Sequence, residues 1–389
     1  MSVEWLNESL FEDILKKEYK EYQVISFVVK DAVPKGENYA SMIKRVSIGL
    51  KLTDSTETIK NYIIKSDKSS EFSSYVNGTL YPKERLMFEK FIPRFESLFK
   101  ETPEKAQFAP ICYKTMDDIH TFILDDLQSK NFVHTKRQQG MDLQHAEATL
   151  AKLAQFHAAS RCIFELEGPY PDIFDEGLYK EELVPIYENM FQNIWPIIYK
   201  DMTKWTDCKE YVDKLAIQKP HMIHLLMESL TYDPSEFNVL NHGDLWSNNI
   251  MFQYKDDGSM NEVLFIDFQL CKWGSPVQDL LHFIITSCNP DIRVSKFDYL
   301  ISHYHKHLTE SLNLLNFKGK IPELDDLHAQ LKKRGYYGVN TSLSILPAVL
   351  MEPGEKTLQQ SLKIYSNPKY REAMKDLLQW FSVRGLLDI

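Results

Sequence analysis

The clearest pattern of hydrophobic and polar positions in the chain lies between residues 239 and 268. Apolar runs at 239–240, 250–252 and 263–266 have the length and composition of short buried strands. The polar stretch His-Gly-Asp-x-x-x-x-Asn separates the first two runs, and Asp267 follows the third directly. This pattern predicts a loop and a strand end that deliver polar side chains to one cleft.

Three of these side chains, Asp244, Asn249 and Asp267, have the chemistry of a phosphoryl-transfer site. Such a site positions an acceptor hydroxyl and neutralises phosphate charge with metal ions. Asn249 and Asp267 offer the oxygen ligands that Mg²⁺ prefers, which leaves Asp244 to accept the proton of the hydroxyl. Two alternatives are a hydrolase with His242 and Asp244 as metal ligands, and a polar turn without chemistry. No second histidine cluster with metal-ligand spacing accompanies His242.

The same motifs carry a family resemblance. Residues 242–249, followed by Ile-Asp-Phe-Gln at 266–269, resemble the aminoglycoside phosphotransferase and choline kinase group within the protein-kinase-like fold. More closely, Gly-Asp-Leu-Trp-Ser-Asn-Asn-Ile-Met-Phe and Phe-Ile-Asp-Phe-Gln are similar to the ecdysteroid kinase-like (CHK kinase-like) family of insects. Further similar segments run from Gly36 to about Asp279. The resemblance implies a two-lobed kinase-like fold, with ATP as phosphoryl donor.

The N-terminal region has the pattern of a β-hairpin. Residues 22–30 are rich in β-forming residues, and residues 45–52 alternate strictly between polar and apolar. Strand, turn and strand is the geometry of a hairpin that covers phosphates. The resemblance assigns the turn to that role, with the contact residues Gly36, Asn38, Tyr39, Ala40 and Ser41. Taken by itself, and with a single glycine, the stretch reads as an ordinary hairpin turn.

A lysine and a glutamate further along complete the expected nucleotide site. The apolar run 58–65 ends in Lys65, which by pattern alone would be a solvated edge residue. A kinase-like site needs one fixed ammonium against the α- and β-phosphates, so we assign Lys65 to that role. In the helix predicted from about Pro82, Glu84 is the expected partner of Lys65, with Glu89 as the competitor. Pro93 is expected to end or kink this helix.

The stretch 121–127 is an apolar strand that stops at two acids. It resembles the family's hinge, where backbone groups bind the adenine edge, and the residues concerned are Leu124, Asp125, Asp126 and Leu127. Without the resemblance, paired acids at a strand end are mostly solvated. We place the lobe boundary here, with an N-terminal lobe at 1–126 and a C-terminal lobe at 127–389.

Three further residues are expected to support the site. Asp142 is a good N-cap for a helix whose apolar face carries His157. A histidine on such a face is usually a buried, hydrogen-bonded support, and the resemblance implies that His157 braces the catalytic loop. His242 stands in that loop. Asp279 is expected to cap a helix and to bond catalytic-loop amides.

Three departures from protein kinases exclude a protein-kinase activation segment. Eleven residues separate Asp267 from Asp279, which leaves no room for a phosphorylatable loop. Gln269 replaces the glycine of protein kinases, and Gly243 stands where they have an arginine that reads activation-loop phosphate. We therefore expect a small-molecule acceptor. Aromatic residues between 169 and 233 are mostly core, and some are expected to line an acceptor pocket.

Composition is that of an ordinary globular protein of one or two lobes. The chain has 389 residues, 43% hydrophobic and 26% charged, so it can bury a large core. A net charge of −10 argues against nucleic-acid or anionic-membrane partners. The five cysteines have no paired spacing, which suggests reduced thiols and a cytoplasmic location. Residues 1–20 read as an amphipathic helix and not as a signal peptide.

The sequence as a whole predicts an α+β, two-lobed protein-kinase-like fold, with a small antiparallel sheet and a large helical lobe. Its expected activity is ATP- and Mg²⁺-dependent phosphorylation of a hydrophobic alcohol by a monomer, and the resemblance suggests an ecdysteroid or a hydroxylated xenobiotic. The alternative is a kinase-fold protein that binds a ligand without turnover. His303, His305 and His307 are expected to fan around a helix and not to form a metal site.

Overall fold

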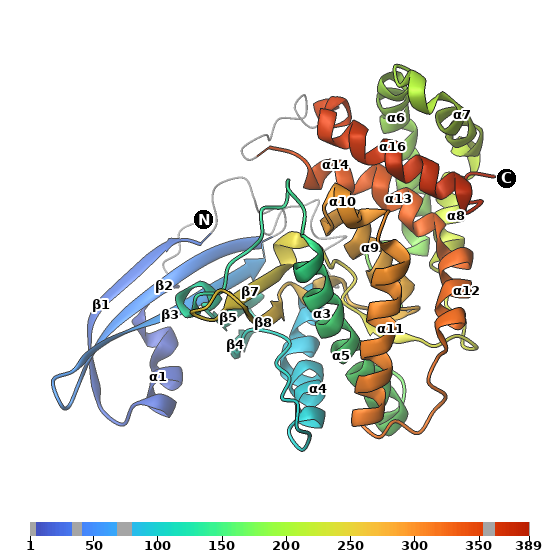
Figure 1. Ribbon diagram of the computed structural model, residues 1–389. Helices are drawn as coiled ribbons and strands as arrows, with labels where there is room; N and C mark the ends of the chain where they lie inside the picture. Colours follow the sequence, from blue (N-terminus) through green and yellow to red (C-terminus); the bar gives the residue numbers. More distant parts are fainter. Residues whose placement is uncertain (1–4, 33–40, 68–79, 353–361, 389) are drawn as a thin grey trace.

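The computed structural model describes residues 5–32, 41–67, 80–352 and 362–388. Within them the chain forms two lobes, an antiparallel sheet with its packed helices and a larger helical part (Figure 1). Gly36, Asn38, Tyr39 and Ala40 lie outside the described residues, as does the start of the predicted N-terminal helix. The α+β two-lobed architecture expected from the sequence is confirmed.

The sheet of the smaller lobe has five antiparallel strands in the order β1-β2-β3-β5-β4. The strands are β1 (Tyr22–Asp31), β2 (Ser41–Leu52), β3 (Glu57–Asp67), β4 (Cys112–Met116) and β5 (Thr121–Asp125). Alternation in β2 buries Val46, Ile48 and Leu50 on one face, against Phe11 and the short helix α1 (Glu12–Glu18). Because successive side chains alternate between faces, Ile64 of β3 joins this core while Lys65 faces the opposite side.

The opposite face of the sheet is covered by the helix that follows β3. This helix is described from Leu80 and consists of α3 (Leu80–Leu86), a π-helical turn (Met87–Phe91) and α4 (Ile92–Phe99). Pro93 was expected to end or kink the helix; it does not end it, and it lies in the first turn of α4. The wider π turn directly before it interrupts the regular backbone bonding there, so the missing N–H of proline is tolerated. Phe88 contacts Phe122 of β5, which fixes this helix on the sheet.

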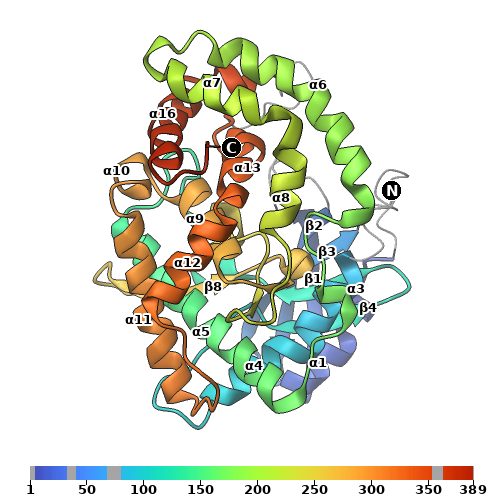
Figure 2. The same cartoon turned by 90° about the vertical axis from the view of Figure 1, so that its right-hand side faces the viewer.

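The larger lobe is mainly helical (Figures 1 and 2). Its central pair is α5 (Leu143–Glu167) and α11 (Phe297–Leu314), which pack side by side. The other helices are α6 (Val184–Met202), α7 (Lys209–Gln218), α8 (Met222–Ser229), α9 (Val277–Ser287), α10 (Pro290–Arg293), α12 (Leu324–Arg334), α13 (Tyr336–Ser344), α14 (Leu346–Val349) and α16 (Pro368–Val383). No helix in the described ranges is long and apolar enough to cross a membrane.

Two small two-stranded sheets carry the polar loop between the lobes. Strand β6 (Val239–Asn241) pairs with β9 (Lys272–Gly274), and β7 (Ile250–Tyr254) pairs with β8 (Met260–Phe265), all antiparallel. The three apolar runs of the sequence are therefore strands, as expected. The residues between β8 and α9 are occupied by a 3-10 turn (Phe268–Leu270) and β9, so the segment is as short as the spacing indicated. All five cysteines are free.

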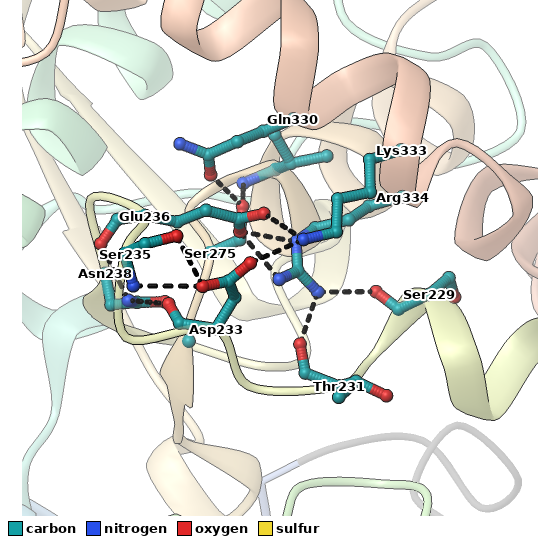
Figure 3. Close-up of polar contacts among 12 residues, drawn as sticks. Ser229, Thr231, Asp233, Ser235, Glu236, Asn238, Ser275, Gln330, Lys333 and Arg334 are labelled. Atoms are coloured by element: carbon teal, nitrogen blue, oxygen red, sulfur yellow. Dashed lines mark hydrogen bonds and ion pairs between the residues drawn. The ribbon is translucent and has the colours of Figure 1, made fainter.

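A polar network anchors the segment that leads into β6 (Figure 3). Arg334, at the end of α12, is 1% exposed. Its guanidinium donates to Glu236 at 2.6 and 2.8 Å and to the carbonyls of Ser229 and Thr231 at 2.6 to 3.0 Å. The neighbouring, exposed Lys333 bonds Asp233 at 2.6 Å and Glu236 at 2.8 Å. The network therefore ties α12 and the end of α8 to the segment that leads into β6 and the polar loop after it.

Candidate active site

Lys65 lies at the centre of the polar cluster between the lobes. Its Nζ is 2.7 Å from Glu84 Oε2 and 2.7 Å from Asp267 Oδ1. Burial acts to lower the pKa of Lys65, but the charges of Asp267 and Glu84 outweigh it and raise that pKa above its ordinary value. Lys65 is therefore a fixed cation that joins β3, α3 and the end of β8. Glu89, the competing partner, contacts Thr115 and Arg85 instead.

Helix α3 places Glu84 against both Lys65 and the segment after β8. Glu84 is 2% exposed, and its Oε1 also accepts from the backbone N–H of Phe268 at 3.2 Å. Burial raises the pKa of this carboxyl, and the charge of Lys65 acts in the opposite direction. Glu89 lies five residues later, within the π turn, and is exposed, so Glu84 and not Glu89 reaches the lysine.

Asp267 has a left-handed backbone conformation, with φ of 70°. Few residues other than glycine adopt it, and strained backbone of this kind is concentrated at functional sites. The side chain is 28% exposed, so it opens to the space between the lobes while one oxygen bonds Lys65. Gln269 Nε2 lies 3.4 Å from the other oxygen. The residue that replaces the glycine of protein kinases thus contacts the expected metal ligand.

Asp244 and Asn249 are held together within the polar loop. Asn249 Nδ2 donates to Asp244 Oδ2 at 2.9 Å and to the Asp244 carbonyl at 2.8 Å, which leaves the amide oxygen of Asn249 available to a cation. Burial, followed by the charge of Asp267, raises the pKa of Asp244 well above its ordinary value. The charge of Asp267 thus acts on the Asp244 carboxyl. Backbone pairing of Ile266 N with Asn249 O, at 3.0 Å, joins their two segments.

Asp279, on helix α9, hydrogen-bonds the backbone at the start of the polar loop. Its carboxylate accepts from the backbone N–H groups of His242 at 2.6 Å and Gly243 at 2.9 Å, as the sequence led us to expect. Its expected role as a helix cap is wrong, because Pro276 is the N-cap of α9 and Asp279 lies within the helix. These donors, together with His157, lower the pKa of Asp279 despite its burial. It therefore stays ionised in the core.

Gly243 is required by close packing at this point. Its φ is +81°, and a Cβ at this position would lie 2.0 Å from the carbonyl oxygen of Leu270. No larger residue fits without displacement of the segment that follows Asp267. The arginine of protein kinases is therefore excluded here by backbone geometry.

Two buried histidines support the loop. His157 is fully buried on α5 and its Nε2 lies 3.1 Å from Asp279 Oδ2, while Nδ1 contacts the Tyr304 hydroxyl at 2.8 Å. His242 is also buried, and its Nε2 lies 3.1 Å from the Ile266 carbonyl. Burial lowers the pKa of both rings. His157 thus contacts the loop through Asp279, and His242 joins the loop to the segment before Asp267.

The segment expected to contact adenine has buried acids, and not solvated ones. Asp125 is 5% exposed and pairs with Lys130, and Asp126 is 2% exposed and accepts from Arg45 Nε at 2.6 Å. Leu124 belongs to the core, and Leu127 packs with Met251 and Leu264 of the β7–β8 hairpin. The acid side chains are thus occupied by basic partners. The contact with adenine stays a prediction, as does the role of Ser41, the first residue of β2.

Sequence reasoning missed one residue beside Asp244. His282 Nε2 lies 3.5 Å from Asp244 Oδ1. It belongs to α9, whose residues are all buried, so its hydrophobic pattern distinguishes no functional position. The available signal was its spacing of three residues from Asp279, which puts both on one helix face. The histidines of α11 bond separate carbonyls or Glu310, and no three-residue metal cluster occurs among the described residues.

Three buried histidines make the stability of the protein sensitive to acid. Burial lowers the pKa values of His157, His242 and His282, that of His282 to about 4. Between about pH 6.5 and 5 the unfolded state binds protons that the folded state does not, so the free energy of unfolding decreases as the pH falls. Each histidine contributes a slope of up to about 1.4 kcal/mol per pH unit.

Urea unfolding between pH 7.5 and 5 measures this slope. His282→Gln is expected to reduce it, because one differential proton is removed. The matched control is His224→Gln, on the exposed side of α8, which should leave the slope unchanged. A free energy of unfolding that does not change over this range would contradict the expectation that the three rings are neutral in the folded protein.

The chain is similar to a protein family and to a solved structure. The model of the ecdysteroid kinase-like family matches residues 35–317. A solved structure similar to the chain is the GDP complex of a mutant aminoglycoside 2′-phosphotransferase, with 12% identity and a TM-score of 0.42, covering 98% of this chain and 99% of the other. No curated protein matches. Because the family model covers most of the sequence, including Lys65, Asp244 and Asp267, the chain belongs to the ecdysteroid kinase-like family.

Proposed function

We propose that this small-molecule kinase transfers the γ-phosphoryl group of ATP to a hydroxyl of a hydrophobic alcohol. The observation that carries the proposal is the position of Lys65, bonded at 2.7 Å to both Glu84 and Asp267, while Asp244 and Asn249 are held together in the adjoining loop. A protein that only binds a ligand has no use for this whole set. Phosphoryl transfer needs each of its members.

Each residue has a part in the proposed reaction. Asp244 accepts the proton of the acceptor hydroxyl. The oxygen of that hydroxyl bonds the γ-phosphorus, while the bond between the γ-phosphorus and the β,γ-bridging oxygen breaks and ADP leaves. The raised pKa of Asp244 suits a general base. Lys65, fixed by Glu84, faces the α- and β-phosphates, and residues 124–127 contact adenine. The hairpin turn with Gly36 to Ser41 covers the phosphates.

Asn249 and Asp267 would hold Mg²⁺, which neutralises the phosphate oxygens when bound. The fit rests on their donor set, one amide oxygen and one carboxylate, and on the negative charge of Asp267 that raises the pKa of Asp244. A cation between these groups relieves that repulsion. Mg²⁺ typically takes one or two protein oxygens and completes its shell with phosphates and water, so a three-ligand protein cluster is not required.

The family name suggests an ecdysteroid as one acceptor, and a hydroxylated xenobiotic is the other candidate, which would make the protein a detoxification enzyme. We further propose that it acts as a monomer in the cytoplasm, without nucleic-acid or membrane partners. The net charge of −10 supports the exclusion of polyanionic partners.

Mass spectrometry of the wild-type protein incubated with Mg·ATP and a panel of ecdysteroids and simple alcohols tests the proposal. One acceptor is expected to gain the mass of one HPO₃ group, with equimolar ADP. Asp244→Asn is the matched control and should form no product. Thermal stabilisation by Mg·ATP without any phosphorylated compound, in the panel or in a metabolite extract, would favour the alternative, a ligand-binding protein without turnover.

A further inference from the structure

We propose that His282 is a positioning residue for Asp244 and orients its carboxylate through an Nε2–H donor. The inference rests on the proposed function, in which Asp244 is the general base. His282 is 1% exposed, and its Nε2 lies 3.5 Å from Asp244 Oδ1. Within the described chain, Nε2 has no hydrogen bond at ordinary length. A buried nitrogen 3.5 Å from the carboxylate is therefore available to it, and such contacts commonly shorten when substrate binds.

The tautomer that this role requires follows from the neighbours of His282 on α13. The His282 Nδ1 is 3.2 Å from the Tyr337 hydroxyl. A lone pair on Nε2 would be repelled by the Asp244 carboxylate 3.5 Å away, so the favoured arrangement is the one in which the Tyr337 hydroxyl is the donor. Tyr337 then donates its own proton to His282 Nδ1. A neutral imidazole that accepts at Nδ1 carries its hydrogen on Nε2, on the side of Asp244.

The ring is neutral under ordinary conditions. Burial lowers the pKa of His282 to about 4. Charge on the ring therefore plays no part in the contact, and a single N–H orients the carboxylate. The two carboxylate oxygens have different donors, because Asn249 Nδ2 bonds Oδ2 at 2.9 Å and His282 faces Oδ1. A donor at each oxygen, together with the Trp246 side chain that also hydrogen-bonds this carboxylate, fixes its orientation and so the direction of the lone pair that receives the acceptor proton.

Helix α9 then holds the catalytic loop at two points. Asp279 bonds the backbone N–H groups of His242 and Gly243, and His282, three residues later on the same helix face, contacts the side chain of Asp244. Backbone and side chain of the loop are thus positioned by one buried, rigid element. This is the arrangement expected for a residue that must be held within a fraction of an ångström.

Three variants separate orientation from packing. His282→Gln keeps an N–H donor near the position of Nε2, whereas His282→Leu keeps volume without a donor. Tyr337→Phe keeps the donor but removes the hydroxyl that sets the tautomer. Turnover is measured as ADP release from Mg·ATP, with water as acceptor and with ecdysone. We expect His282→Leu to lower kcat by about 10- to 100-fold, the effect of one hydrogen bond to a charged group.

His282→Gln should stay within a few-fold of wild type, Tyr337→Phe should lie between the two variants, and the KM for ATP should be unchanged in all three. Equal losses of kcat in His282→Leu and His282→Gln would overturn the inference in favour of a packing role. So would normal kcat in a folded His282→Leu protein.

A measurement without turnover keeps the inference separate from the proposed function. In ¹⁵N-histidine-labelled wild-type protein, the ring signals of His282 are assigned by their loss in His282→Gln. We expect the Nε2–H tautomer near neutral pH, and an Nδ1–H tautomer would overturn the inference whether or not the enzyme is active. If wild-type protein shows the Nε2–H tautomer but neither hydrolyses ATP nor phosphorylates any acceptor, the proposed function fails and the contact is structural.

Discussion

Asp267→Asn is expected to abolish phosphoryl transfer at least as completely as Asp244→Asn. Loss of a general base removes roughly 10²- to 10⁴-fold in rate. We expect a larger loss of rate from the change at Asp267, because this residue is proposed to offer the charged oxygen for Mg²⁺ and also bonds Lys65 at 2.7 Å. Its replacement by the isosteric amide therefore disturbs both the metal and the ammonium that face the triphosphate. Initial rates of ADP formation at saturating Mg·ATP measure the effect.

Binding of the nucleotide distinguishes the two roles. Asp267→Asn should lose most of the thermal stabilisation that Mg·ATP gives the wild-type protein, whereas Asp244→Asn should retain it, because Asp244 is assigned to the acceptor. Asp256→Asn, in the exposed turn between β7 and β8 that leads to Asp267, is the matched control and should behave as wild type. Near-normal turnover of Asp267→Asn would refute its assignment as a metal ligand.

Arg334→Met is expected to lower the free energy of unfolding by about 3–5 kcal/mol, the usual cost of removing one partner of a buried ion pair. Arg334 is 1% exposed and satisfies Glu236 together with the carbonyls of Ser229 and Thr231 (Figure 3). Its removal leaves a nearly buried carboxylate with one remaining partner and two carbonyls unpaired. Urea unfolding monitored by tryptophan fluorescence measures the difference.

The adjacent lysine provides the control. Lys333 pairs with the same Glu236, but its side chain is 55% exposed, and exposed pairs contribute about 0–1 kcal/mol. Lys333→Met should therefore change stability little. The double variant Arg334→Met with Glu236→Leu should recover part of the loss, since no charge is then buried alone. Equal losses of unfolding free energy in Arg334→Met and Lys333→Met would show that the burial of a side chain does not determine how much its ion pair stabilises the protein.

Local patterns were sufficient for the strands and for much of the polar site. Alternation identified β2, and apolar runs located the strands that precede the polar loop and Asp267. The motif also named Asp244, Asn249 and Asp267 as one group, and the structure brings their segments together. These signals are visible in sequence because period-2 burial and a polar loop between buried strands depend on neighbours along the chain.

Packing overturned two local expectations. Pro93 was expected to end or kink its helix, yet the preceding π turn lets the helix continue. Asp125 and Asp126 would have been solvated at an isolated strand end, but Lys130 and Arg45 approach and allow their burial. The approach of Arg45 has no local signature, because it lies 81 positions from Asp126. The π turn and Lys130 are close in sequence to the residues they accommodate, but the hydrophobic pattern did not reveal either feature.

The amino-acid sequence alone determined the alternation of polar and apolar residues in the strands, the family, and the set of oxygen-bearing side chains proposed to act on phosphate. Only the tertiary structure decided that Lys65 meets Glu84 and not Glu89, that Asp279 lies within its helix and does not cap it, and that His282 faces Asp244. These contacts join residues that are far apart along the chain, up to 202 positions in the case of Lys65 and Asp267. Their geometry is set by the packing of β3, α3 and α9, which no local pattern encodes.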